Sequence, residues 1–582
     1  MEYWLNALDF ACIIAIYALA LNLVLGYAGQ LTIAPAGLGG VGGYTAAYLS
    51  LSHGWAFVPA LVLGVVTAIV VGFLLGLPAL RLSQDYLILL TLAFAAVVIA
   101  IFEAIPALGG VYGLIGVPPV SIGDTMLITA AEYLRIALPI MLVCLLVCWR
   151  IGSSPFGRVL RGIREDEPAT EALGKNVLGF KVLTFSITAG IMGLAGVLYV
   201  YFQQSATPTA FGFAQTTAIV AAVVIGGSGN ILGSLAGAVL VSFASPVLQK
   251  TVDLAPETAG TVQLVIYGAL LIAIMRLMPG GIIPEGASLR LLRRRGPGGA
   301  GAPTTNGSGE YRRPRAMARA PLPSNGGGEA KPVVQVRDVA KHFNGIQAVR
   351  GLSFDLPAGR VTALLGPNGG GKTTLFNLNT RRNRPVTGEV LLDGKDIVGL
   401  PPHRVARLGM VRSFQDVRNL GRLTLLQNVS LAVPDQPGEQ LRNVFFRPLS
   451  SRRGERAARE RALEVLDYVG LADRQDMLAG ELGYGDQKLL SLARILATGG
   501  EVLLIDEPAS GVDAGSMESL LAAIESLRSL GKTICLVEHN LDVVEHLADH
   551  VLFMEQGQIT ARGPMTEIKG DPRLAEVYFG HV

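Results

Sequence analysis

The chain has 582 residues, of which 51% are hydrophobic and only 16% are charged, and its formal net charge is +3. This length excludes a single ordinary domain, and the small net charge gives no support to nucleic-acid binding. The four cysteines form no disulfide framework, so a disulfide-stapled secreted domain is excluded as well.

The composition divides the chain into two halves. Residues 1–286 are almost free of charge, whereas residues 333–582 have an ordinary soluble composition. Apolar runs near 20 residues long recur in the first half at 5–26, 57–80, 86–105, 134–150, 179–202 and 260–278. Each is long enough to cross about 30 Å of hydrocarbon. We therefore predict an all-α polytopic membrane domain over 1–286, whose first segment is a membrane span rather than a signal peptide.

Shorter or glycine-rich apolar runs fill the remaining space at 33–52, 213–228 and 231–249. Basic loops predict the orientation, because cytoplasmic loops carry an excess of Lys and Arg. One cluster lies in a connection and the other follows the last span; they comprise Arg150, Arg158, Arg161 and Arg164, and then Arg290, Arg293, Arg294 and Arg295. Both clusters are expected to be cytoplasmic, so an even number of crossings separates them.

That count requires two passes in the stretch 213–249, with a turn at Gly226–Asn230. By the same logic the loop near 106–133 faces outward and Arg81 faces inward. Whether 33–52 crosses or re-enters is left open, and so is the side of Met1.

Two glycine-dense stretches, 26–43 and 226–237, do not resemble lipid-facing helix. Glycine permits close helix packing, and it also permits irregular backbone that is tolerated only against protein or a water-filled cavity. Tight packing and a translocation path both remain open. Few ionisable groups are embedded, which argues against a proton relay or an ion channel and suits a solute with an apolar body.

The connection at 155–175 is short, charged and amphipathic. It is either a solvated loop or a segment that docks on a cytoplasmic partner and transmits motion. Residues 287–332 are rich in Arg, Gly, Pro, Ser and Asn and predict a flexible linker, which as a coil spans on the order of 35–40 Å. Its arginines lie where they can touch anionic lipid.

The second half contains the pattern G-x-x-x-x-G-K-[ST], after the apolar, β-prone run Val361–Leu365 and before a possible helix start. A chance glycine-rich turn is the alternative to a phosphate-binding loop. In such a loop, backbone N–H groups and a helix N-terminus surround a phosphate. Lys372 would reach the β and γ phosphates, and the Thr373 hydroxyl would bind Mg²⁺. The predicted nucleotide-binding residues here are Gly366, Pro367, Asn368, Gly369, Gly370, Gly371, Lys372, Thr373 and Thr374.

Further signals lie on both sides of this loop. Phe343 is placed to stack on adenine, and Gln415 could join the γ phosphate and Mg²⁺ to a moving interface. A glycine-led segment before a helical pattern could offer N–H groups to a phosphate; it comprises Leu482, Gly483, Tyr484, Gly485 and Asp486.

The run Val502–Asp506 predicts a buried strand that ends in an acid. Asp506 would hold Mg²⁺ through water, and Glu507 would act as general base on the attacking water. His539 ends another apolar strand, which places it near the γ phosphate. Singly, His539 or Gln415 is more often structural than catalytic, but this order and spacing leave little room for chance.

Together these motifs resemble the cassette of ATP-binding cassette (ABC) transporters across 333–582, an α/β P-loop NTPase fold that uses ATP and Mg²⁺. Residues 482–486 take the place of the family's signature, and Ser510–Asp513 take the place of its D-loop. The resemblance implies that two cassettes close head to tail. Each ATP then lies between one phosphate loop and the signature of the other cassette.

The resemblance narrows to importers of branched-chain amino acids. In the cassette it is carried by Arg412–Gln415, Tyr484–Gln487, Val537–His539 and Val577–Gly580. In the first half it is carried by residues 19–30, 85–87, 91–94 and 157–167, which are similar to a permease subunit of the same system. The chain therefore looks like a natural fusion of permease and cassette, in which 155–175 is the coupling segment seated on the cassette.

The resemblance implies ATP-driven import of branched-chain or other hydrophobic amino acids across the bacterial inner membrane, with the cassette in the cytoplasm. It also implies a second permease, a second cassette (or a second copy of this chain for both) and an external, periplasmic or lipid-anchored solute-binding protein. Import of urea, short amides or organic acids is the alternative within the class. An exporter of lipid or drug and a non-transporting membrane ATPase or sensor are further alternatives.

Three positions depart from the family pattern. Gly483 stands where the signature has a serine, so the ATP site made with this signature is expected to be the weaker of two. Asn379–Arg382 replace the usual apolar-then-glycine ending after the phosphate-loop helix. Asn540 replaces a frequent aspartate.

Overall fold

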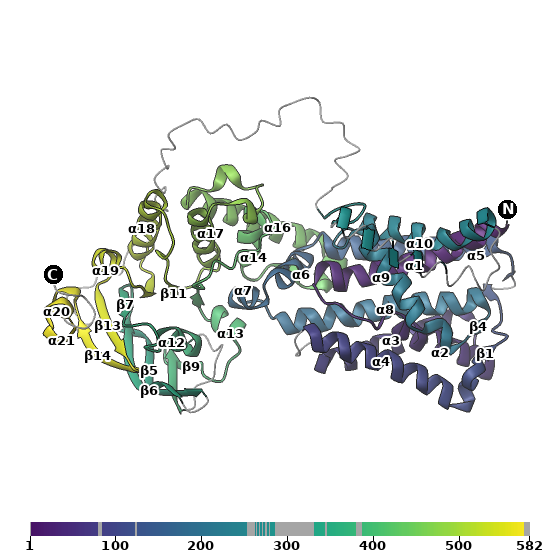
Figure 1. Ribbon diagram of the computed structural model, residues 1–582, viewed down its shortest axis with the longest axis horizontal. Coiled ribbons are helices and arrows are strands. Elements are labelled where there is room, and N and C mark those ends of the chain that lie inside the picture. Colours follow the sequence, from purple (N-terminus) through teal and green to yellow (C-terminus); the bar gives the residue numbers. More distant parts are fainter. Residues whose placement is uncertain are drawn as a thin grey trace, which may run out of the picture. The chain divides into compact units, whose positions relative to one another are not determined.

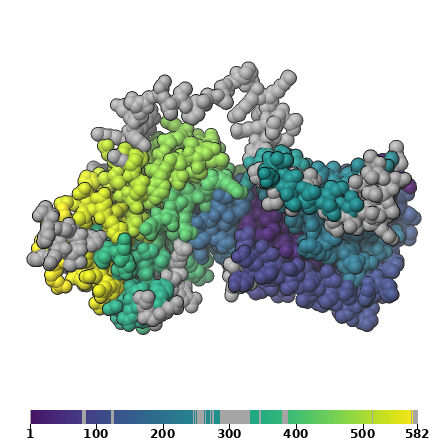
Figure 2. All heavy atoms as spheres, in the orientation of Figure 1, coloured from purple at the N-terminus to yellow at the C-terminus, as the bar shows by residue number. Residues whose placement is uncertain are grey.

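The computed structural model describes residues 2–79, 84–122, 125–252, scattered positions between 262 and 285, 331–343, 346–379 and 387–574. The chain forms two compact units. One contains residues 1–164 and 178–304, and the other contains 165–177 and 305–582. Figures 1 and 2 show both units in the colours of the sequence. We call them the membrane unit and the cassette unit, and describe each by itself.

The membrane unit is helical, as predicted, and the chain is a multi-pass membrane protein. Among the described residues, six helices are long and apolar enough to cross a membrane. The helices of this region are α1 (Glu2–Asn22), α2 (Pro35–His53), α3 (Phe57–Ala79), α4 (Gln84–Ala104), α5 (Ala130–Gly152), α6 (Pro155–Glu165), α8 (Val177–Gln203), α9 (Phe213–Gly226) and α10 (Ile231–Val252). A π-helical turn, η1 (Leu23–Tyr27), continues α1.

Contacts define the two ends of the membrane unit. At one end the guanidinium of Arg164 donates to the carbonyl of Gly26 and pairs with Glu285 at 2.8 Å. At the other end β1 (Leu114–Ile115) pairs with β4 (Ser205–Ala206). Because η1 lies at the Arg164 end, α1 begins at the opposite end. The side of the N-terminus, which the sequence left open, is thus the side facing away from Arg164.

Helix α2 packs against β1 and β4 at one of these ends. Just before it, the backbone N–H of Ile33 donates to Thr91 on α4, 3.1 Å away. Near its last turn, the hydroxyl of Ser50 bonds to that of Tyr201, close to the end of α8. Residues Pro35–His53 therefore form one continuous helix that contacts α4 just before its start and α8 near its last turn.

The stretch 213–249 forms two helices, α9 and α10, joined by a turn at 227–230, as predicted. This turn packs against the first glycine-rich stretch. The side-chain oxygen of Asn22 accepts from the N–H of Gly229 at 2.8 Å, and its amide donates to the carbonyl of Asn230 at 3.0 Å. A Cβ on Gly26 would collide with Gly229, so the glycines serve close backbone packing here.

The cassette unit contains two sheets. A four-stranded antiparallel sheet has the order β6-β5-β8-β9, and a six-stranded sheet has the order β10-β11-β12-β7-β13-β14, in which only β14 is antiparallel. The strands are β5 (Pro332–Phe343), β6 (Ile346–Pro357), β7 (Val361–Leu365), β8 (Thr387–Leu392), β9 (Lys395–Asp396), β10 (Met410–Arg412), β11 (Val502–Asp506), β12 (Thr533–Val537), β13 (His550–Glu555) and β14 (Gln558–Gly563).

Helices cover these sheets (Figure 1). Those used below are α7 (Glu167–Ala172), α12 (Lys372–Asn379), α13 (Pro402–Arg407), α14 (Leu425–Ala432), α15 (Leu441–Phe446), α16 (Pro448–Tyr468), α17 (Tyr484–Ala497), α18 (Ala514–Ser529) and α19 (Leu541–Leu547). The unit has the α/β architecture that the sequence predicted.

The central strands explain where the site lies. Every residue of β7, β11 and β12 is buried, which accounts for their continuous apolar sequences, because parallel strands are covered on both faces. The carboxyl ends of parallel strands meet at one edge of a sheet. The residues after β7, β11 and β12 are therefore brought to the same edge.

Several predictions concern residues outside the described part of the chain. These are the inward position of Arg81, about half of the span predicted at 260–278, the linker over 287–332 except its last two residues, the departure at 380–382 and the ending Val577–Gly580.

Candidate functional site

The predicted phosphate loop follows β7 directly. Gly366, Gly369 and Gly371 have φ angles of 146°, 80° and 99°, a region that L side chains rarely adopt. A Cβ on Gly366 would also collide with the carbonyl oxygen of Met554 on β13. Helix α12 begins at Lys372, so the loop ends at a helix N-terminus suited to an anion.

Lys372 lies against its own loop. Its ammonium donates to the carbonyls of Gly366 at 2.7 Å and Pro367 at 2.9 Å, and the residue is only 6% exposed. Burial lowers the pKa of Lys372, and the nearby Glu507 and Asp506 carboxylates oppose that shift. A phosphate can replace the two carbonyls as the partner of this cation.

Asp506 ends β11 and is buried. Its Oδ2 accepts from Arg412 at 2.8 Å, while its Oδ1 is buried without a hydrogen-bond partner. Burial raises the pKa of Asp506, and Arg412 works against that rise. A buried carboxylate oxygen with nothing to bind fits a Mg²⁺ ion or its water, as oxygen ligands are those Mg²⁺ prefers. Within the described ranges, no group of three or more His, Cys, Asp or Glu could hold a metal.

Glu507, Gln415 and His539 are brought together. The Glu507 carboxylate accepts from Gln415 Nε2 at 2.9 Å and lies 3.2 Å from His539 Nε2. Its backbone has φ 44° and donates to the carbonyl of Val537 at 2.9 Å. The side chain is thus oriented from both sides, as a general base requires.

Sequence reasoning missed Glu538, the buried residue before His539. Its carboxylate accepts from the backbone N–H groups of Ala509 at 2.7 Å and His539 at 2.9 Å, which ties β12 to the segment after Glu507. Asn540, two residues after Glu538, caps α19: its side chain accepts from the backbone N–H groups of Asp542 and Val543. This cap is the physical role of the residue that departs from the family pattern.

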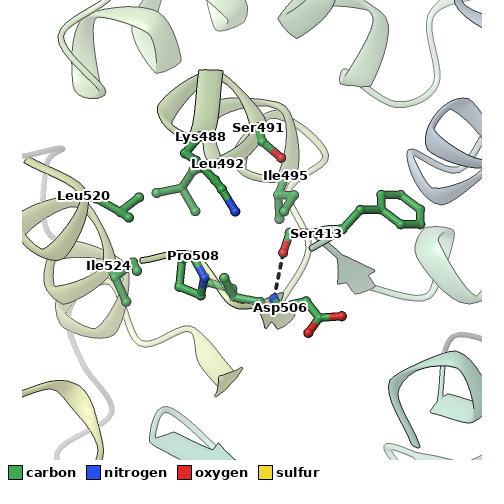
Figure 3. Close-up of a pocket in the computed structure, with 11 residues that line it drawn as sticks. Ser413, Lys488, Ser491, Leu492, Ile495, Asp506, Pro508, Leu520 and Ile524 are labelled. Carbon is green, nitrogen blue, oxygen red and sulfur yellow. Dashed lines mark hydrogen bonds between the residues drawn. The ribbon is translucent and has the colours of Figure 1, made fainter. Parts of the chain in front are cut away.

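Lys488, on the buried face of α17, was also missed. Its ammonium donates to the carbonyls of Gln415 and Glu507, at 3.0 Å in each case. Burial lowers the pKa of Lys488, and surrounding carboxylates, first among them Glu538, oppose the shift. Figure 3 shows it above a small cavity beside Ser413 and Asp506. The cavity has a volume of about 20 Å³, enough for one water.

The signature segment lies at the start of α17, which Gly483 precedes as N-cap. The structure positions this segment through Arg474, which pairs with Asp486 at 2.6 Å, and through Ser516, against which Gly485 packs. Tyr484 is exposed. A Cβ on Gly483 would meet nothing within 4 Å, so neither packing nor backbone demands a glycine there.

Phe343 is the last residue of β5. Its ring is 41% exposed, and the ammonium of Lys341 lies 5.2 Å from the ring centroid. An exposed ring of this kind is open to stacking on a base.

The connection predicted to be a coupling segment belongs to the cassette unit over residues 165–177. Asp166 caps α7 by accepting from Ala169 at 2.7 Å and pairs with Arg418 at 3.2 Å. The Arg418 guanidinium lies 5.1 Å from the ring of Phe414, the neighbour of Gln415. Arg418 and Phe414 therefore connect the segment to the loop after β10, in which Gln415 lies.

The far end of this segment is held as well. Lys175 is buried, and its ammonium pairs with Glu439 at 2.5 Å and donates to the carbonyl of Val433 at 3.0 Å. Arg407 donates to the carbonyl of Gly174 at 3.0 Å. Leu173 belongs to a hydrophobic cluster formed mainly by α14, α16, α17, α18 and the strands β11 and β12. The segment is therefore an integral part of the cassette unit rather than a solvated loop.

This fold and this arrangement define the class of ABC transporter proteins, with a membrane-spanning part and an ATP-binding cassette in one chain. Residues 3–275 match the family described as "Branched-chain amino acid transport system / permease component", and residues 349–510 match the family described as "ABC transporter".

Among curated proteins, BraF of Pseudomonas aeruginosa, a high-affinity branched-chain amino acid transport ATP-binding protein, is 35% identical over 43% of this chain and 99% of its own length. LivG of Escherichia coli, of the same description, is 34% identical over 43% and 99%. A solved nucleotide-free ATP-binding cassette from an ABC transporter is 31% identical, covers 43% of this chain and 100% of its own, and has a TM-score of 0.38. The chain belongs to the family of branched-chain amino acid ABC transporters.

Proposed function

We propose that the chain is the fused permease and ATPase subunit of an importer of branched-chain or other hydrophobic amino acids, in the bacterial inner membrane with its cassette in the cytoplasm. Matches to a permease family in one half and a cassette family in the other support this proposal, as do the names of the relatives. The observation that carries it is the seating of residues 165–177, which lead directly into α8, on the residues next to Gln415.

In the proposed ATP site, Lys372 and the loop N–H groups bind the β and γ phosphates, and Phe343 stacks on adenine. Thr373 and Asp506 would hold the Mg²⁺, with Gln415 beside them, and the ion would neutralise charge on the phosphates. Glu507 takes the proton of the attacking water. Its carboxylate is oriented by Gln415 and by His539.

The contacts of Gln415 couple nucleotide binding to transport in this proposal. When Gln415 turns to a bound nucleotide, its hydrogen bond to Glu507 is exchanged, and the backbone that also carries Phe414 and Arg418 moves with it. Arg418 holds Asp166, so the coupling segment moves too. The permease thereby changes its opening when ATP binds, and hydrolysis resets it.

The proposal includes partners. A second cassette would offer its signature to the Lys372 loop, and this chain's residues 482–486 would face the partner's ATP. A second permease completes the path, or a second copy of this chain supplies both. An external solute-binding protein would deliver the amino acid.

The test is uptake into proteoliposomes that contain the chain and its partner subunits. We expect ATP inside the vesicles and the solute-binding protein outside both to be required, and leucine, isoleucine or valine to be accumulated. Accumulation of urea, short amides or organic acids in their place would contradict the substrate. Transport that needs no binding protein would contradict import itself.

A further inference from the structure

Three large apolar side chains are exposed along one short stretch of the cassette unit. Phe445 and Phe446 end α15, and Leu449 lies in the first turn of α16; they are 40%, 84% and 69% exposed. Phe446 is thus almost wholly outside the fold. Contiguous exposed apolar side chains of this size mark an interaction surface rather than a packing feature.

The same stretch is strongly basic. Residues 442–456 contain five arginines and one glutamate. All five arginines are exposed; Arg456 pairs with Glu460, and the other four are Arg442, Arg447, Arg452 and Arg453. We name the patch of these four arginines with Phe445, Phe446 and Leu449 the basic–aromatic patch. Arginines around protruding aromatic and aliphatic side chains are typical of segments that lie in a membrane interface, where the rings enter the acyl boundary and the cations meet anionic headgroups.

The chain itself places this patch near a bilayer. Lys175, which pairs with Glu439, stands two residues before α8, and α8 is a candidate membrane span of 27 residues. At 1.5 Å per residue α8 is about 40 Å long, which exceeds the roughly 30 Å of the hydrocarbon, so its first turns have room in the interface. Glu439 is therefore held beside the point where the chain enters the membrane.

The patch begins just after Glu439. Helix α15 starts at Leu441 and ends at Phe446, a length of about 9 Å. Phe446 thus lies within one short helix of that point of entry. The patch is also fixed to the segment that carries Glu439, because Pro437 in that segment packs against Gly454 of α16.

We propose that the basic–aromatic patch docks on the anionic lipid surface of the membrane that α8 enters, with Phe446 and Leu449 inserted among the headgroups and the arginines on lipid phosphates. The cassette then rests on the bilayer through this patch as well as on the coupling segment. The proposal needs α8 to span the membrane, but it does not depend on which solute is carried.

The test uses the full chain in nanodiscs of phosphatidylcholine, with or without phosphatidylglycerol. The four native cysteines are buried, so a spin label on Phe446→Cys reports from this position alone. A label on Gln558→Cys, at an exposed position of β14, is the matched control. In Figure 1, β14 lies at the other side of the cassette unit from α16.

We expect phosphatidylglycerol to raise the collision rate of the Phe446 label with oxygen and to lower its collision rate with a water-soluble nickel reagent, with no change at position 558. Reversing Arg452 and Arg453 to Glu should abolish this lipid dependence. Reversing Arg350 and Arg562, which are also exposed, should not. ATP hydrolysis in detergent verifies that the variants fold.

Two results would overturn the proposal. A label that stays accessible to the nickel reagent in both lipids would show that the patch faces water. A label shielded from both reagents regardless of lipid would show that the patch contacts protein, for example a second permease subunit.

Discussion

In the proposed function this chain contributes one half-site to each of two ATP sites, and these two half-sites are built in opposite ways. Near the phosphate loop, the two predicted carboxylates are held by partners from other elements: Glu507 by Gln415 and His539, and Asp506 by Arg412. The signature segment is exposed at Tyr484 and has open space at Gly483. One half-site is preorganised within the chain, whereas in the proposed function the other becomes a site only against a second cassette.

Among the substitutions that test this contrast, Lys372→Met is expected to have the largest effect. Lys372→Met removes the charged donor to the phosphates, and a hydrogen bond to a charged group contributes about 1.5–3 kcal/mol. Nucleotide affinity should fall by roughly 10- to 100-fold. Equilibrium binding of a fluorescent ATP analogue measures this loss. Unchanged affinity would mean that the loop at 366–374 is not the phosphate site.

A smaller effect is expected for the link between the site and the coupling segment. Asp166→Asn breaks the pair with Arg418, and such partly exposed pairs contribute about 0.2–1 kcal/mol. We expect the amount of solute transported per ATP to fall, with hydrolysis retained. Arg422→Gln, which removes the longer 3.7 Å pair with Glu165, is the matched control and should have a smaller effect. Equal losses of hydrolysis and transport would argue against a coupling role for Asp166.

Lys488 tests how firmly the preorganised half-site is held. Lys488→Met leaves the carbonyls of Gln415 and Glu507 without their donor, and an unsatisfied buried acceptor costs about 1–3 kcal/mol. We expect the rate of hydrolysis to fall by about tenfold with little change in nucleotide affinity. Lys488→Arg should restore part of the rate. Loss of affinity and rate together would indicate a general structural defect.

The pH dependence of Lys488 has a defined sign. Its folded pKa is lowered by burial, so the cost of burying its charge is present below that pKa and disappears as the pH rises toward the unfolded value of about 10.4. The rate of ATP hydrolysis should instead fall as the pH rises through the folded pKa, because the ammonium that donates to both carbonyls is then lost. The alkaline limb of the rate profile should therefore move to higher pH in Lys488→Arg, whose guanidinium stays protonated. An unmoved limb would exclude Lys488 as its origin.

A small gain, rather than a loss, is expected at Gly483. Serine fits there without collision, and its hydroxyl would add about one hydrogen bond, or 0.5–1.5 kcal/mol, to the partner's phosphate. Gly483→Ser should raise ATP affinity or turnover a few-fold, whereas Gly483→Ala, which adds bulk without a donor, should not. No gain from serine would mean that the signature half-site is not limited by its missing hydroxyl.

The sequence predicted those parts of the molecule that local patterns encode. The loop at 366–374, Asp506, Glu507 and His539 follow buried strands, and parallel strands must bring their ends to one edge. Lys488 could not be found in this way, because a lysine on an amphipathic helix is ordinarily a surface residue until packing buries it. Arg418 and Glu538 likewise acquire their roles from partners distant in sequence.

The membrane unit shows the same limit. Long apolar runs predicted its spans, but the path of α2 depends on contacts at Thr91 and Tyr201 that its glycine-rich sequence does not reveal. Asp9, one of the few charged residues of the membrane unit, was also not predicted to be buried. Its carboxylate is buried on α1, and neither oxygen has a hydrogen-bond partner among the described residues.

The measurement that tests the account most directly is Mg²⁺-dependent ATP hydrolysis by the chain in lipid, alone and with its partner subunits, for the wild type and Glu507→Gln. Removing a general base costs typically 10²- to 10⁴-fold, so the account predicts a loss of about that size with nucleotide binding intact. ATP turnover that is unchanged in Glu507→Gln would contradict the account, because the half-site built around Glu507 would then not be the one that hydrolyses ATP.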